Sequence, residues 1–140
     1  MNIRLYFMTV ELRQNQKEGT RNPYSRFMYG LKSPESKRQY PKRFGVFLDF
    51  IGIKDQSFED RLYDLYIQSK QNVEWLQDSL IEFIEFQKER AGRDEIKETT
   101  IPNYYKPVKL FCDMNNIVAN WNIVTRGMPR GSDAANFEQY

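Results

Sequence analysis

The chain has 140 residues, of which 40% are hydrophobic and 29% charged, a composition typical of one globular domain and not of a disordered chain. It holds no histidine and one cysteine, which removes the commonest general base and the usual zinc ligands, so we expect neither a metal nor a cofactor. The net charge of +2 conceals a division, because residues 1–45 carry 10 basic and 3 acidic side chains, residues 46–100 carry 7 and 13, and residues 101–140 carry 4 and 3.

Residues 1–24 are predicted to form a loosely attached arm. Apolar and polar side chains alternate weakly from Ile3 to Val10 and a polar run follows, so the first 30 residues show no clean helical period. Arg4 and Glu11 interrupt the apolar start, and no small-residue cleavage site follows. This pattern argues against a membrane span or a secretory signal and favours a cytoplasmic location.

The first predicted helix extends from Ser33 to Gly52. Ser33 suits the N-cap, Pro34 the first turn and Gly52 the stop after the last turn. Its apolar positions recur every three or four residues and are Tyr40, Phe44, Phe47, Leu48 and Ile51. Pro41 removes one backbone hydrogen bond and predicts a kink.

Two further helices are predicted in the acidic middle of the chain. Ser57 opens one that runs to about Lys70, and Asn72 caps another that ends near Gly92. The second of them carries carboxylates around the side away from its apolar positions, namely Glu74, Asp78, Glu82, Glu85 and Glu89. With no histidine or glycine-rich loop nearby, these carboxylates predict an acidic solvated face and not a catalytic or metal site.

A fourth helix is predicted to begin at Thr100 and Pro102 and to run to about Asn115, with an irregular turn at Pro107. Cys112 lies in its apolar ridge, which predicts a buried and inert thiol. Residues 117–140 are predicted to form a short helix or turn that leads into an extended linker. No hairpin pattern follows residue 30, so we expect an all-α fold, a compact four- to five-helix bundle whose domain spans residues 25–116.

Two of these helices offer donors that suit phosphate. On a helical projection, cations of the first helix border one exposed strip, and polar residues of the fourth point away from its Val108 ridge. The candidate DNA-binding residues are Lys37, Arg38, Lys42, Arg43, Thr100, Asn103, Lys106 and Lys109. Cations neutralise phosphates, whereas Asn103 and Lys106 suit base edges. The alternative is that each of these side chains is an ordinary solvated surface group.

Aromatic residues interleave with cations between residues 24 and 40, a pattern that also suits stacking on single strands. The residues concerned are Tyr24, Phe27, Tyr29 and Tyr40. Core packing is the favoured interpretation for these rings.

Three segments resemble the N-terminal core-binding domain of tyrosine recombinases, the phage-type integrases. Residues 33–51 (SPESKRQYPKRFGVFLDFI) look like its first helix, and residues 99–114 (TTIPNYYKPVKLFCDM) resemble the helix with a Leu-x-x-Phe pair, here Val108 and Phe111. Residues 123–135 (IVTRGMPRGSDAA) are similar to the segment that leads into the catalytic domain of archaeal integrase-like proteins. The likeness covers about residues 24–136, and its order and spacing are more specific than any one motif.

The resemblance implies a SAM-like helical bundle that binds double-stranded DNA through its first and fourth helices, with other recombinase protomers as further partners and no membrane contact. In that family, cleavage belongs to a separate C-terminal domain with a tyrosine, arginines, a lysine and a histidine. No position here matches that motif, so the resemblance implies no catalytic residue and no enzymatic activity. The competing hypothesis is a helical protein–protein interaction module that uses the acidic third helix and aromatic surface residues.

Overall fold

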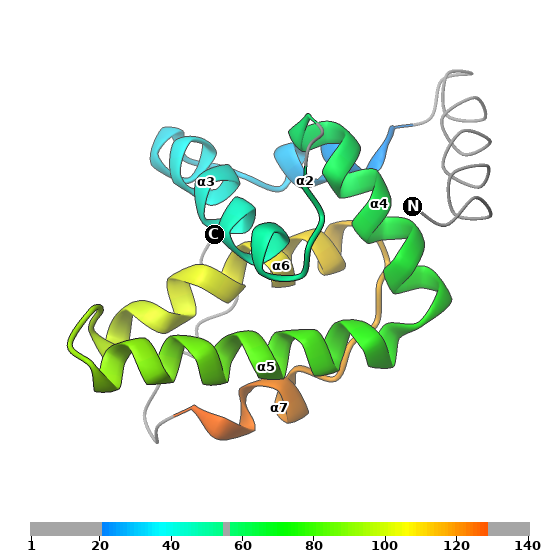
Figure 1. Cartoon of the computed structure of the whole chain (residues 1–140). Coiled ribbons are helices and arrows are strands. Elements are labelled where there is room, and N and C mark those ends of the chain that lie inside the picture. Colours follow the sequence, from blue (N-terminus) through cyan, green and yellow to red (C-terminus); the bar gives the residue numbers. More distant parts are fainter. Residues whose placement is uncertain (1–20, 55–56, 129–140) are drawn as a thin grey trace.

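The computed structural model describes residues 21–54 and 57–128, and these residues form a compact bundle of helices without a β-strand (Figure 1). The all-α prediction is therefore confirmed. The elements are α2 (Pro23–Tyr29), α3 (Pro34–Phe50), α4 (Phe58–Gln71), α5 (Val73–Gly92), η1 (Glu98–Thr100), α6 (Ile101–Met114), α7 (Trp121–Val124) and η2 (Thr125–Gly127). None of the helices in this part of the chain combines the length and apolar character that crossing a bilayer requires.

Local capping sets the starts of α3, α4 and α5 where the sequence predicts them. The Ser33 hydroxyl accepts a hydrogen bond from the Ser36 amide at 3.0 Å, and the Ser57 hydroxyl accepts one from the Asp60 amide at 3.1 Å. Asn72 Oδ1 accepts from the Trp75 amide, also at 3.1 Å. Each cap satisfies a backbone donor that the first turn leaves without an intrahelical partner.

The two internal prolines do not interrupt their helices. Pro41 lies inside α3 and Pro107 inside α6, and both helices continue past them. Each proline removes one backbone hydrogen bond. α3 and α6 pack against each other more extensively than any other pair of helices in the described residues, and this packing offsets the loss.

The helix α2 forms in a segment where the sequence shows no clean helical period, and it includes Pro23 and Tyr24 of the predicted arm. Asn22 Oδ1 accepts from the Ser25 amide at 2.7 Å, and Pro23 occupies the first turn. α2 is only seven residues long and sends Phe27 fully into the core, so it shows no repeating apolar period. Residues 1–20 of the predicted arm lie outside the described residues.

A buried asparagine and a glycine fix α2 against α6. Asn115, 2% exposed, donates to the Pro23 carbonyl at 3.3 Å and accepts from the Arg26 guanidinium at 3.2 Å. At Gly30, a Cβ atom would stand 2.9 Å from the Met114 side chain, closer than carbon atoms normally approach. A side chain at this position would require the Met114 and Leu110 side chains to shift.

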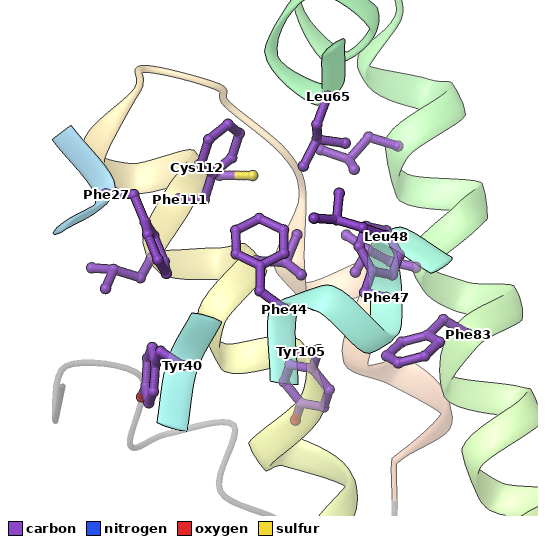
Figure 2. Close-up of a cluster of buried hydrophobic side chains, with 14 of the residues drawn as sticks. Phe27, Tyr40, Phe44, Phe47, Leu48, Leu65, Phe83, Tyr105, Phe111 and Cys112 are labelled. Carbon is purple, nitrogen blue, oxygen red and sulfur yellow. The ribbon is translucent and has the colours of Figure 1, made fainter. Parts of the chain in front are cut away.

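Aromatic rings from three helices meet at the centre of the bundle (Figure 2). The Phe44 ring centroid lies 5.3 Å from that of Phe27 and 5.4 Å from that of Phe111, both with edge-to-face geometry. Cys112 is fully buried in the same core, and this burial raises the pKa of its thiol far above the ordinary value. The thiol therefore stays protonated and inert near neutral pH, as the sequence predicts.

The packed body extends beyond residue 116, the predicted end of the helical domain. Ile117 and Val124 are buried, and α7 packs against α5 on the side that faces away from α3 in Figure 1. The Gln77 side chain accepts from the Asn120 amide at 2.8 Å, and Lys88 donates to the Gly127 carbonyl at 2.9 Å. Residues 117–127 are thus part of the packed body and include the short helix α7, and residues 129–140 of the predicted linker lie outside the described residues.

Arg61 of α4 fixes the end of α3. Its guanidinium donates to the Ile53 carbonyl at 2.7 Å, to the Asp49 carboxylate at 2.5 Å and, more weakly, to the Gly45 carbonyl at 3.4 Å. The Arg61 side chain is only 15% exposed, and its replacement leaves the carbonyls of buried Ile53 and half-buried Gly45 without this donor, whereas the Asp49 carboxylate is 62% exposed and stays solvated.

We expect Arg61→Met to lower the free energy of unfolding by about 1–3 kcal/mol. The matched control is Arg93→Met, which removes an exposed arginine paired with Glu95 and should change that free energy by less than about 0.5 kcal/mol. Urea denaturation followed by circular dichroism measures both values. Equal effects of the two substitutions would contradict the role assigned to Arg61.

Candidate nucleic-acid interface

Four cations gather on the N-terminal two-thirds of α3. Lys37, Arg38 and Lys42 are exposed, and Arg43 is half-buried. Arg38 and Lys42 are one turn apart, on the side of α3 opposite the core residues Phe44 and Phe47. The helix therefore places these two positive charges on one exposed side, with Lys37 and Arg43 flanking it.

Arg38 is paired within the described part of the chain. The Arg38 guanidinium lies 2.5 Å from the Glu35 carboxylate, with both side chains more than half exposed. Hydrogen bonds from Gln39 and then from Arg38 lower the pKa of Glu35, so this carboxylate is ionised near neutral pH. An exposed ion pair of this kind contributes little stability, and a phosphate oxygen can replace the carboxylate beside Arg38.

Lys109 of α6 does not join the α3 cations. Its ammonium lies 2.8 Å from the Asp113 carboxylate and 5.8 Å from the centre of the Trp121 ring of α7. Phe111, which touches Phe44 of α3, lies about 200° further around the helix axis than Lys109. Lys109 thus faces α7 and α5, where it lines a pocket with Gln77 and Asn120.

The remaining α6 candidates are half-buried. Thr100 precedes the first turn, and its hydroxyl makes no capping hydrogen bond. Asn103 lies about 80° around the axis from Phe111, nearer to the α3 side, whereas Lys106 lies about 140° away. Arg38 and Lys42 therefore share one exposed side of α3, whereas Lys37 and Arg43 each lie about 100° around the axis from the nearer of those two. The four α6 residues spread over about half of their helix.

The aromatic residues near α2 divide between core and surface. Phe27 and Tyr40 are buried and Tyr24 is partly buried against the core, in line with the favoured interpretation. Tyr29 is 71% exposed, and the Arg21 guanidinium stands 5.0 Å from its ring centre. The sequence offered no signal that separates Tyr29 from its neighbours, because α2 was not predicted.

The acidic face of α5 is as the sequence predicts. The five carboxylates Glu74, Asp78, Glu82, Glu85 and Glu89 are all exposed. In residues 21–54 and 57–128, no three cysteine or carboxylate side chains lie close enough together to hold a metal ion. Five exposed carboxylates on one side of α5 make this face an extended region of negative potential.

Comparison of the chain with protein-family models, with curated proteins and with solved structures found no match.

Proposed function

We propose that this protein binds double-stranded DNA as the core-binding module of a site-specific tyrosine recombinase. The observation that carries the proposal is the group of cations on the first part of α3, where Lys37, Arg38 and Lys42 are exposed and Arg38 and Lys42 lie on the side opposite the aromatic core. The resemblance of residues 33–51 and 99–114 to the integrase domain gives the reason for choosing a duplex and the recombinase class.

Electrostatic attraction between the α3 cations and the DNA phosphates provides most of the proposed affinity. Lysine and arginine side chains on α3 neutralise phosphates and release condensed counterions, which gives affinity with little sequence preference. Asn103 and Lys106 on α6 are the proposed base-reading residues, and Thr100 is a proposed phosphate contact. Of the eight candidate residues, Lys109 has the least support as a DNA contact, because Asp113 and Trp121 already lie beside its ammonium.

The module acts in the cytoplasm in this proposal, and other recombinase protomers are its protein partners on the DNA. It performs no catalysis, since residues that match the recombinase catalytic motif are not found in the sequence. The SAM-like arrangement of the helices is part of the same proposal. DNA cleavage would come from a separate catalytic domain.

The test is binding of the full chain to a fluorescent duplex, measured by anisotropy across salt concentrations. With about four phosphate contacts, the affinity should fall roughly 100-fold between 50 and 200 mM salt. A protein–protein interaction module would bind little duplex at any salt concentration. Binding that is absent at low salt, or that does not change with salt, would reject the proposal.

A further inference from the structure

A second surface lies where the end of α3 meets the C-terminal half of α5. Phe50 and Phe86 are 39% and 38% exposed, and Val46, one turn before Phe50, is 37% exposed. The Phe50 ring centroid lies 5.3 Å from that of Phe86 and 5.2 Å from that of the fully buried Phe83. We call Val46, Phe50 and Phe86 the α3/α5 patch.

Tightly packed core side chains lie directly beneath the α3/α5 patch. The Phe83 ring beneath it lies 5.2 Å from Phe47 and 6.4 Å from Tyr104, in edge-to-face contacts that fix it in place. Phe50 and Phe86 therefore cannot turn inward without displacing core rings. Single exposed apolar residues are ordinary, but neighbouring exposed rings on a rigid floor are typical of a surface that another molecule covers.

The charges beside the patch indicate the chemistry of that molecule. Glu82 and Glu89 lie one turn before and one turn after Phe86 on α5, and Glu85 precedes it directly. All three are exposed, and in the described part of the chain none of them has an ion pair. A partner that covers Phe86 therefore brings its own side chains against unpaired negative charge.

We propose that the α3/α5 patch docks a segment of another protein that presents apolar anchors flanked by lysine or arginine. An amphipathic basic helix fits this description, with its apolar side chains on Phe50 and Phe86 and its cations over the glutamates of α5. Lys42 lies one turn before Val46 on α3 and would repel a cation of the partner there. The lysine or arginine residues of the partner therefore lie over the glutamates of α5. The inference does not depend on DNA binding.

The probe is a helical peptide of about 18 residues made of leucine and lysine, with leucine at helical spacing, and its control replaces every lysine by glutamate. Isothermal titration calorimetry with the full chain and no DNA measures binding. We expect the leucine–lysine peptide to bind in a salt-dependent manner and the leucine–glutamate peptide not to bind.

Two sets of variants assign the binding to the patch. Glu82→Gln/Glu85→Gln/Glu89→Gln should weaken peptide binding at least tenfold, while Glu74→Gln/Asp78→Asn/Glu98→Gln, with the same change of charge, should weaken it less than threefold. These residues are all exposed, so both variants should fold. Phe86→Ser should also weaken binding at least tenfold, whereas Ile123→Ser, at the 50%-exposed Ile123 of α7, should not.

Three results would overturn the proposal. They are no binding of the leucine–lysine peptide, equal binding of both peptides, and equal loss in the two glutamate variants. Sedimentation velocity adds a fourth, because a dimer of the native chain that Phe86→Ser abolishes would show that a second copy covers the patch.

Discussion

Phe44→Ala is expected to lower the free energy of unfolding by about 3–5 kcal/mol. Phe44 is fully buried, and its ring meets Phe27 of α2, Phe58 of α4 and Phe111 of α6 at centroid distances of 5.3, 5.9 and 5.4 Å. Truncation to alanine removes these contacts and leaves a cavity where four helices meet. Since domains of this size are stable by only about 5–15 kcal/mol, the substitution should remove a large fraction of the free energy of unfolding.

Val46→Ala is the matched control on the same helix. Val46 is 37% exposed, and alanine has the higher helix propensity, so the free energy of unfolding should change by less than about 1 kcal/mol. Urea denaturation gives both values with the same protocol. If Phe44→Ala were no more destabilising than Val46→Ala, the central position of Phe44 would be wrong.

The second large effect is expected from neutralising the α3 cations. In the variant Lys37→Gln/Arg38→Gln/Lys42→Gln/Arg43→Gln, the slope of log affinity for duplex against log salt should shrink by about 3.6, which is 0.9 for each lost phosphate contact. At 0.1 M salt this corresponds to a loss of affinity on the order of 10³-fold. Anisotropy titrations at several salt concentrations measure both quantities.

The control for this variant removes four cations elsewhere, with Lys54→Gln/Arg93→Gln/Lys97→Gln/Arg126→Gln. These four side chains are exposed and lie after α3, in the segment that follows α5 and in η2. The net charge changes equally, so any loss due to overall charge alone appears in both variants. A loss of similar size in the control would show that α3 is not the contact surface.

The helix starts could be predicted because capping is local. Ser33, Ser57 and Asn72 each lie three residues before the amide that they accept from, so the sequence alone contains both partners. The start of α2 has the same local signal in Asn22 and Pro23, but the helix is too short to show an apolar period, and its place depends on distant partners such as Asn115 and Phe44. Short helices of this kind are fixed by tertiary packing.

The candidate nucleic-acid interface could likewise be predicted only where it depends on a single helix. Arg38 and Lys42 could be placed on the exposed side of α3 because helical periodicity alone decides which residues oppose the core. The environment of Lys109 depends on α7, whose Trp121 covers that side of α6, and nothing in residues 100–115 signals this contact. The α3/α5 patch likewise needs two helices to meet, although Phe50 and Phe86 are 36 positions apart in the sequence.

The most direct test of DNA binding by α3 is a nuclear magnetic resonance titration of the isotope-labelled chain with a duplex, which its mass of 16.9 kDa permits. We expect the amide shift changes to concentrate in residues 37–43 and to leave the acidic face of α5 unchanged. Changes that are absent, or that are centred on Glu74 to Glu89, would contradict the proposed function.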